Sequence, residues 1–264
     1  MSIGYRPRGM SMWDPWTIEH QGVVHMFYLQ RLAKDSDRPQ PEEDWLGHAS
    51  SPDLIHWTEH ALALPPGQPG ALDDLQPWTG CVVDHAGRFY HFYTMRAKAD
   101  LGFGASQRIG LALSDDLEHW ERYSDNPVIV PDSRWYYSHD HPLPRGAHDH
   151  QVDCRDLLVV RDPSGDGWYG FFAARIPAEE LSETSVVAAA HSRDLLHWEQ
   201  LPPAFTPRKY ACVEMHDVFP LDGRWYMTCL TGTFYGNRGL YSDPNCIRGT
   251  IYAVADQPQG PYRE

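Results

Sequence analysis

Short runs that mix apolar, aromatic and polar residues recur along the whole chain. Four of them begin with a glycine and are rich in aromatic side chains: GVVHMFYLQ (22–30), GRFYHFYTM (87–95), GWYGFFAAR (167–175) and GRWYMTCLT (223–231). Aromatic and β-branched residues bounded by Gly turns predict β-strands joined in hairpins. Helical periodicity is scarce, and 22 Pro and 21 Gly are scattered through the chain. Both observations oppose long helices.

Each aromatic run is the second member of a series. A first run precedes it in every case: WDPWTIEH (13–20), WTGCVVDHA (78–86), CRDLLVVRD (154–162) and EMHDVFPLD (214–222). A third run follows it: WLGHAS (45–50), RIGLALS (108–114), SVVAAAHS (185–192) and GTIYAVA (249–255). The chain therefore predicts four successive antiparallel units.

The third run is followed three times by the heptapeptide S-x-D-L-x-H-W, at residues 51–57, 114–120 and 192–198. A fourth short strand is expected after each copy, whereas the fourth unit ends in P-x-G-P-Y (258–262). Four-stranded antiparallel units in series predict a β-propeller. We expect the Asp of each copy to hold the turn by accepting backbone N–H groups. We expect the Trp (Trp57, Trp120, Trp198) to pack between neighbouring sheets.

Composition narrows the classes of partner. The chain has 264 residues, which we interpret as one β-propeller domain over 1–264, and a net charge of −14. That charge opposes nucleic-acid binding. No apolar run is long enough to span a bilayer, so no membrane is predicted. Five Cys without C-x-x-C spacing, and no apolar signal segment at the start, predict a cytoplasmic protein.

The first strand of each unit would line the centre of a propeller. Three of these strands carry carboxylates, Asp14, Asp156 and Glu214. Carboxylates gathered at one point repel each other, and glycoside hydrolysis needs such a set. Taken singly, Asp14 also fits a turn before Pro15, Asp156 a salt bridge with Arg155, and Glu214 a surface strand.

The ordered motifs WDPW, HMFYLQ, WLGHASSPDLIHW, WTG, CRDLLVV and EMHDVFPLDGRWYM resemble glycoside hydrolase family 32, the invertases, inulinases and levanases. The resemblance implies an all-β, five-bladed β-propeller that acts on β-fructofuranosyl units with retention of configuration. It implies that Asp14 is the nucleophile, Asp156 the transition-state stabiliser and Glu214 the acid/base. Further residues are expected to bind the sugar: Trp13, Trp16, Gln30, Trp45, Trp78, Arg155 and His216.

The chain departs from the family pattern beside each carboxylate. It has Trp13-Asp14-Pro15-Trp16, Leu157 after Asp156, and Glu214-Met215-His216-Asp217. These departures put the identity of the sugar in doubt more than the reaction class. Two alternatives stay open at this point: an inverting arabinosidase or xylosidase like those of family 43, and a non-catalytic sugar-binding propeller.

No cofactor and no metal are predicted. The histidines of the 121–152 loop (His139, His141, His148, His150) could bind zinc or copper, but we favour a polar loop at the rim of the pocket. RDPSGDG (161–167) lacks the Glu that closes an EF-hand and is interpreted as a hairpin turn. The resembling families close their ring with five blades, while only four are evident here. We therefore expect the propeller to be completed by a downstream segment or a dimer partner.

Overall fold

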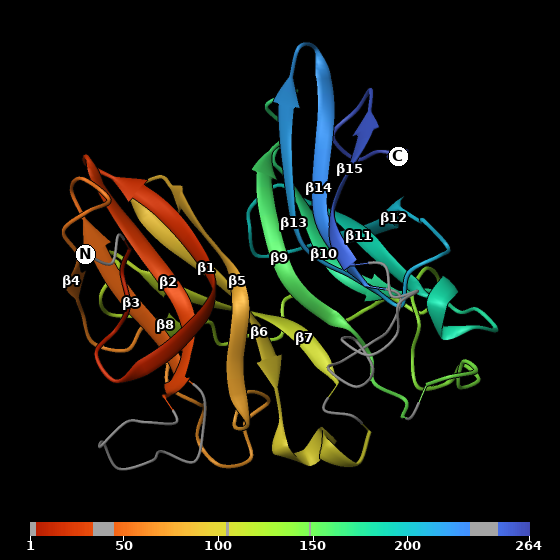
Figure 1. The fold of residues 1–264 in the computed structure, drawn as a ribbon, viewed down its shortest axis with the longest axis horizontal. Helices are drawn as coiled ribbons and strands as arrows, with labels where there is room; N and C mark the ends of the chain where they lie inside the picture. Colours follow the sequence, from red (N-terminus) through yellow and green to blue (C-terminus); the bar gives the residue numbers. More distant parts are fainter. Residues whose placement is uncertain (1–3, 34–44, 104–105, 148, 233–247) are drawn as a thin grey trace. The chain divides into compact units, whose positions relative to one another are not determined.

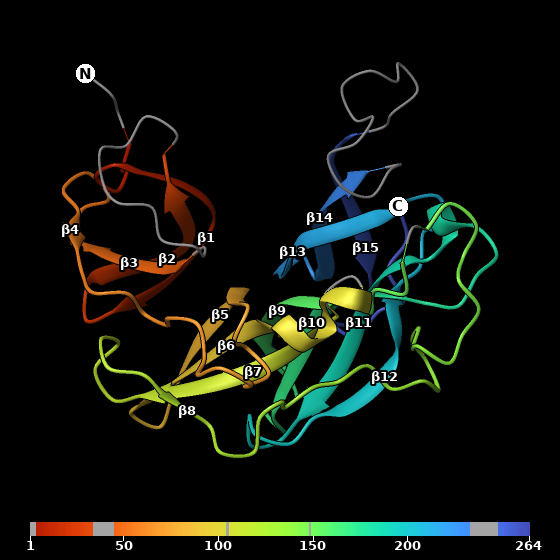
Figure 2. The same ribbon diagram turned by 90° about the horizontal axis from the view of Figure 1, so that it is seen from below.

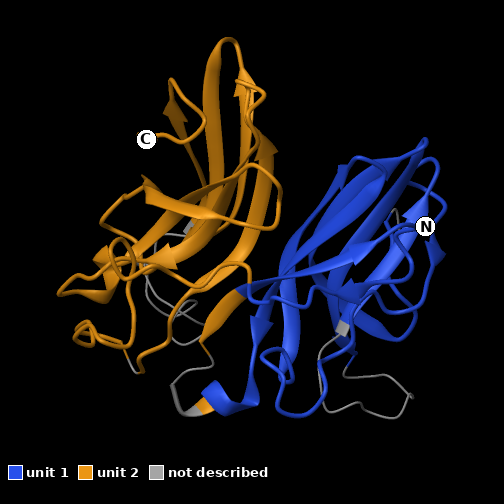
Figure 3. Ribbon diagram, turned by 180° about the vertical axis from the view of Figure 1, so that it is seen from behind, with its two compact units in different colours: residues 1–100, 109–127 blue, residues 101–108, 128–264 orange. Residues whose placement is uncertain are grey.

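The computed structural model describes residues 4–33, 45–103, 106–147, 149–232 and 248–264. The chain forms two compact units (Figure 3). Unit 1 comprises residues 1–100 and 109–127, and unit 2 comprises residues 101–108 and 128–264. Among the described residues, no helix is both long and apolar enough to cross a membrane. The single domain over 1–264 and the cytoplasmic location stay predictions.

Two four-stranded antiparallel sheets begin in unit 1, and in both the strands lie side by side in chain order (Figure 1). The first sheet consists of β1 (Met10–His20), β2 (Val23–Leu32), β3 (Trp45–Ser51) and β4 (Thr58–Glu59). The second consists of β5 (Gln76–His85), β6 (Arg88–Arg96), β7 (Gln107–Ser114) and β8 (Glu121–Arg122). A short 3₁₀ helix, η1 (Lys98–Phe103), lies between β6 and β7.

Unit 2 contains the third and fourth sheets, and Figure 2 shows the strands of the third sheet side by side. The third sheet consists of β9 (Cys154–Arg161), β10 (Trp168–Arg175), β11 (Ser185–Ser192) and β12 (Glu199–Phe205). The 3₁₀ helix η2 (Leu181–Glu183) precedes β11. The fourth sheet consists of β13 (Cys212–Leu221), β14 (Arg224–Gly232) and β15 (Arg248–Ala255).

The four predicted units are confirmed as four consecutive antiparallel sheets of the propeller type. In the described part of the fourth sheet there are three strands, and only a bridge between Val254 and Arg263 stands where the other sheets have a fourth. This agrees with the expectation that the P-x-G-P-Y end replaces the usual one. Completion of the ring by a further segment or a dimer partner stays a prediction.

The three S-x-D-L-x-H-W copies form the same turn. In the second copy, Oδ1 of Asp116 accepts hydrogen bonds from the backbone N–H groups of Glu118 (2.9 Å) and His119 (2.8 Å). Asp53 and Asp194 accept the equivalent pairs at 2.9 and 2.8 Å. The Leu of each copy has a left-handed backbone, with φ from 62° to 67°. The predicted role of the Asp is confirmed.

The three tryptophans of these turns pack in different ways. The ring centroid of Trp120 lies 5.8 Å from that of Phe27 on β2, edge to face, so it links the second sheet to the first. That of Trp57 lies 5.5 Å from Tyr5. Trp198 covers Gly170 of its own sheet, where a Cβ would come within 2.7 Å of the indole. Packing between sheets is therefore confirmed for Trp120.

Each unit has its own apolar core. In unit 2, Phe171 and Val187 of the third sheet pack against Val213, Met227 and Ala253 of the fourth. In unit 1, Phe27 and Leu46 of the first sheet pack against Phe89, Tyr93 and Ala112 of the second. Neighbouring residues on the same strands, such as Tyr28, Phe92 and Phe172, are buried as well, so both faces of these strands are covered.

Candidate active site

The first strand of every sheet is interrupted by a β-bulge at the same place. On β1 the pairing with β2 shifts between Trp13 and Trp16. On β13 it shifts between Glu214 and Asp217. The bulge on β5 falls at Thr79, and that on β9 at residues 156–157, opposite Phe172. A bulge inserts one unpaired residue and turns its side chain out of the regular ladder.

Three of these bulges contain a residue with a left-handed backbone: Asp14 (φ 46°), Asp156 (φ 59°) and Met215 (φ 48°). Asp adopts this conformation more readily than most residues, whereas for Met it costs about 1–2 kcal/mol. Asp14 and Asp156 therefore occupy the same structural position in their sheets, and Glu214 precedes it by one residue. Strain of this kind concentrates at functional sites.

In unit 2, Arg155 joins two of the predicted catalytic carboxylates. Its Nη2 and Nε donate hydrogen bonds to Oε2 of Glu214 at 2.7 and 3.1 Å. Its Nε lies 3.6 Å from Oδ2 of Asp156, and the backbone N–H of Met215 donates to the same oxygen at 3.4 Å. The side chain of Arg155 is 5% exposed and that of Glu214 is 30% exposed. Glu214 can therefore reach a ligand, while the buried Arg155 fixes the position of the Glu214 carboxylate.

A buried ion pair supports Arg155 in turn. Oδ2 of Asp153 lies 3.3 Å from Nη1 of Arg155 and accepts a hydrogen bond from Nε of Arg175 at 2.8 Å. Burial raises the pKa of Asp153, but the two guanidinium groups outweigh it and lower that pKa to about 2. Oε1 of Gln107 completes the shell by accepting from Nη1 of Arg155 at 3.3 Å. Asp153 thus stays ionised and restrains Arg155.

His216 follows Met215 in the bulge of β13. Its side chain is buried, and burial lowers the pKa of His216 to about 4. The imidazole is therefore neutral at pH 7. Within unit 2, the predicted residues Arg155, Asp156, Glu214 and His216 lie on two neighbouring first strands, β9 and β13.

The unit 1 residues predicted to bind sugar lie in several environments. The guanidinium carbon of Arg31 lies 5.2 Å from the ring centroid of Trp13, and that of Arg96 lies 3.8 Å from the ring centroid of Trp78. Trp16 stacks on Phe27 with centroids 6.2 Å apart, so it belongs to the apolar core as well. Asp14 is half-buried.

Gln30 is 5% exposed, and its Oε1 has no hydrogen-bond partner among the described residues. A buried acceptor without a partner is unfavourable, and a hydroxyl group would satisfy it. Gln30 pairs across the ladder with Trp45, whose side chain lies outside the described structure. The roles assigned to all these residues stay predictions.

Sequence reasoning missed the residues that restrain the carboxylates. Arg155 was expected at the sugar or in a salt bridge with Asp156, but its shortest contacts are to Glu214, 59 positions away along the chain. Asp153 and Arg175 gave no separate signal. The adjacent Arg155 and Asp156 were the local clue. A charged side chain on the first strand of a sheet, where it is buried, needs a partner of opposite charge.

The histidines of the 121–152 loop bond to nearby polar groups. Nε2 of His139 lies 3.1 Å from Oγ of Ser106, and Nδ1 of His150 lies 2.8 Å from the hydroxyl of Tyr137. Nδ1 of His141 accepts from the backbone N–H of Ser138 at 3.0 Å. His148 lies outside the described residues. Within the described ranges, no three His, Cys, Asp or Glu side chains are grouped so that they could hold a metal ion.

The hairpin interpretation of residues 161–167 is confirmed. Gly165 donates its backbone N–H to the carbonyl of Asp162 at 2.9 Å, and Asp162 donates to the carbonyl of Gly167 at 2.9 Å. This turn joins β9 to β10.

Comparison with known proteins identifies the family. The profile described as "Glycosyl hydrolases family 32 N-terminal domain" matches residues 6–143, which is more than half of the chain. The chain belongs to glycosyl hydrolase family 32. This family 32 protein is 26% identical to a "Probable sucrose-6-phosphate hydrolase" of Vibrio cholerae, over 73% of the chain and 30% of that relative. It is 25% identical to an "Invertase" of Schizosaccharomyces pombe, over 84% of the chain and 36% of the relative.

Solved structures support the family 32 fold. A β-fructofuranosidase of Bombyx mori aligns with a TM-score of 0.66 and 22% identity, covering 93% of this chain and 46% of the other. An inulosucrase of Halalkalicoccus jeotgali, bound to kestose, aligns with a TM-score of 0.75 and 21% identity, covering 99% and 70%. The family 32 chain therefore spans about a third of the length of the first curated relatives that it matches. The predicted fold and family are confirmed.

Proposed function

We propose that this chain cleaves or transfers β-fructofuranosyl units by a retaining mechanism with two carboxylates. Family membership supports the reaction class, and the relatives named above are a "Probable sucrose-6-phosphate hydrolase" and an "Invertase". The observation that carries the residue assignment is the shared bulge, which presents Asp14 and Asp156 at the same left-handed position of two first strands.

In this mechanism Asp14 attacks the anomeric carbon and forms a fructosyl–enzyme intermediate. Glu214 first protonates the departing oxygen and then takes a proton from the attacking water or sugar hydroxyl. Asp156 accepts hydrogen bonds from ring hydroxyls as charge develops on the sugar. The substrate is a carbohydrate that carries a β-fructofuranosyl unit.

The contact with Arg155 favours one oxygen of Glu214 as the carrier of the transferable proton. Arg155 has only donors, and two of them are directed at Oε2 of Glu214. A proton on Oε2 would face those donors, so the transferable proton would be carried by Oε1. Arg155 then acts as a positioning residue that fixes which oxygen faces the substrate.

The test is product analysis with sucrose, inulin and levan. Aryl arabinosides and xylosides are assayed in parallel, because they are the substrates of the alternative family 43-like activity. Release of fructose or of longer fructosyl products is expected, and the ratio of the two separates hydrolysis from transfer. The first-formed anomer, followed by NMR, should be the retained one. Turnover of arabinosides alone, or inversion of configuration, would contradict the proposal, and binding without turnover would indicate a sugar-binding protein.

A further inference from the structure

A second pocket lies in unit 2 at the opposite end of the third sheet from the bulge. It has a volume of about 650 Å³, within the range of pockets that hold small ligands. We call it the distal pocket and define it by the residues that line it: Asp162, Tyr169, His191, Glu199, Leu201, Pro202, Pro203, Gln259, Gly260 and Pro261. Along β9, Asp156 and Asp162 are separated by about 20 Å at the usual rise per residue.

One row of side chains crosses the sheet beneath the pocket. Tyr169 on β10 pairs with His191 on β11, and His191 pairs with Glu199 on β12. Residues directly opposite each other on neighbouring strands point to the same face. The row therefore presents a phenol ring, an imidazole and a carboxylate side by side, and Tyr169 also packs against the apolar core of unit 2.

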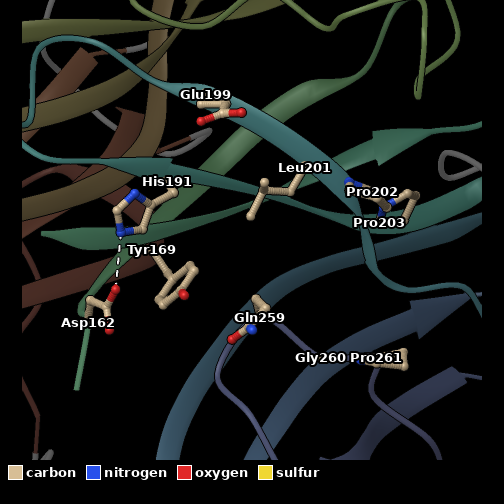
Figure 4. A pocket seen from close by; sticks show the side chains of 10 residues that line it. All are labelled: Asp162, Tyr169, His191, Glu199, Leu201, Pro202, Pro203, Gln259, Gly260 and Pro261. Carbon is tan, nitrogen blue, oxygen red and sulfur yellow. Dashed lines mark hydrogen bonds and ion pairs between the residues drawn. The ribbon is translucent and has the colours of Figure 1, made fainter. Parts of the chain in front are cut away.

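The polar groups of this row are fixed before any ligand arrives. Nε2 of His191 lies 3.1 Å from Oδ2 of Asp162, and the centroids of Tyr169 and His191 are 5.0 Å apart, edge to face. Burial alone would raise the pKa of Asp162, but hydrogen bonds from Ser164 and His191 lower it, so this carboxylate is ionised. Figure 4 shows the ring of Tyr169 between the Asp162–His191 pair and Gln259.

The opposite wall comes from the C-terminal segment. Oε1 of Gln259 is buried and has no hydrogen-bond partner in the described part of the chain. Pro202 and Pro203 of β12 and Pro261 of the C-terminal segment supply rigid apolar surface and no N–H donors (Figure 4). An unpartnered amide oxygen beside an aromatic ring is suited to a ligand with both hydroxyl groups and a C–H face.

Unit 1 shows why the space is open here. The equivalent row of the first sheet contains His25, opposite Ser50. The pocket beside it is lined by Trp120 and His119 of the D-L-x-H-W turn and has about 350 Å³. In unit 2 the fourth sheet has Gln259-Gly260-Pro261 in place of that turn. The distal pocket, which has no such indole in its lining, is the larger of the two.

We propose that the distal pocket is a second carbohydrate-binding site, which holds one or two units of an uncharged oligosaccharide. Tyr169 would pack against the C–H face of the sugar, while Glu199 and Gln259 would accept hydrogen bonds from hydroxyls. The carboxylates of Asp162 and Glu199 exclude anions. The site would bind a long chain away from the point of cleavage, and the choice of fructan as probe rests on the proposed function.

The experiment is affinity electrophoresis of the intact protein in gels that contain inulin, levan, arabinan or xylan, on a Glu214→Gln background so that the probe survives. Tyr169→Ala and Glu199→Ala should each weaken retardation by the retaining polysaccharide, about tenfold for Tyr169→Ala. Tyr169→Phe keeps the ring face and serves as the matched control, with retardation close to that of the parent. With Glu214 restored, Tyr169→Ala should turn over sucrose at the parent rate.

The outcomes separate this inference from the proposed function. If the parent hydrolyses no fructoside yet is retarded by any of the four polysaccharides through Tyr169, the function is wrong and the pocket stands. Equal retardation of the parent, Tyr169→Ala and Glu199→Ala would overturn the pocket, as would no retardation of the parent at all. If Tyr169→Ala melts at a lower temperature, Glu199→Ala decides, because Glu199 is exposed.

Discussion

Both ends of the sheets contain a feature that repeats from sheet to sheet, but their polar groups find hydrogen-bond partners in different places. At the bulge end, defined by the bulges of β1, β5, β9 and β13, the contacts of Arg155 reach Glu214, 59 positions away. At the turn end, defined by the three D-L-x-H-W turns, Asp116 is satisfied by backbone groups two and three residues on. Repetition therefore does not distinguish function from structure. The source of the hydrogen-bond partners does.

The comparison explains why the turns need no ligand. Each turn Asp finds hydrogen-bond partners within its own heptapeptide, including a contact of 2.7–2.8 Å to the His three residues on. At the bulge end, Glu214 is 30% exposed while its partner is buried. The turn carboxylates, although 43–51% exposed, are held by their own heptapeptide, whereas Glu214 is held by a residue of another first strand.

The largest effect is expected from removing the charge of a bulge-end carboxylate. Asp14→Asn and Glu214→Gln should each lower kcat by about 10²–10⁴ and leave the protein folded. Azide should partly restore the Glu214→Gln variant if Glu214 is the acid/base. Steady-state rates on the best fructoside and a far-UV spectrum check both points. Asp116→Asn is the matched control at the turn end, and a loss of rate there as large as in Glu214→Gln would break the comparison.

The second prediction concerns the buried pair behind Arg155. Arg175→Met leaves Asp153 with one cationic partner in a buried site, which should lower the free energy of unfolding by about 3 kcal/mol. The double variant Asp153→Asn with Arg175→Met should recover part of that loss, because no uncompensated charge remains. Urea unfolding followed by fluorescence measures both. A double variant less stable than Arg175→Met would contradict the ion-pair explanation.

The third prediction concerns the pH dependence of folding stability and a group of stacked imidazoles near the turn end of unit 1. Burial lowers the pKa of His48 to about 3, and it lowers the pKa of His25 as well. Because the unfolded chain binds these protons near pH 6.5, the folded state is most stable above that pH and loses stability as the pH falls. For His48 alone the loss between pH 7.5 and 5 should be about 2 kcal/mol.

Urea unfolding at the two pH values tests this expectation, and His48→Gln should flatten the dependence. The centroids of His48 and His60 are 4.4 Å apart, so the variant also changes packing. The slope with pH is therefore the decisive quantity rather than the absolute stability. A slope that His48→Gln leaves unchanged would assign the effect elsewhere.

The fourth prediction measures the turn end itself. Asp116→Ala removes the acceptor of two backbone N–H groups and should cost about 1 kcal/mol, while fructoside turnover stays at the parent rate. Asp116→Asn should cost less, since the amide oxygen still accepts. Asp53 and Asp194 offer the same pair of variants in two further sheets. Similar costs at all three would confirm that the heptapeptide is structural.

Periodicity and turn chemistry were enough to predict the sheets, because both are local. Alternating aromatic runs gave the strands, and the Asp and Trp of the heptapeptide gave the turns. The bulges were not foreseen, because a one-residue register shift depends on pairing with the next strand. The contact of Arg155 with Glu214 was missed for the same reason. It joins β9 to β13, and the local sequence of neither strand indicates it. The distal pocket depends on what replaces a Trp in the last unit.

The smallest effect is expected at Met215, which connects strain to function at the bulge end. Its φ of 48° costs about 1–2 kcal/mol for a residue with a Cβ, and glycine removes that cost. Glycine also increases the entropy of the unfolded chain, by about 0.5–1 kcal/mol. Met215→Gly should therefore stabilise unit 2 by at most about 1.5 kcal/mol. The bulge would then hold Glu214 less rigidly, so kcat should fall while KM changes little. Met215→Ala keeps the Cβ, so it should show neither the gain in stability nor the fall in kcat. If both variants behave alike, the left-handed backbone of Met215 is not the source of strain, and the bulge positions Glu214 through Arg155 alone.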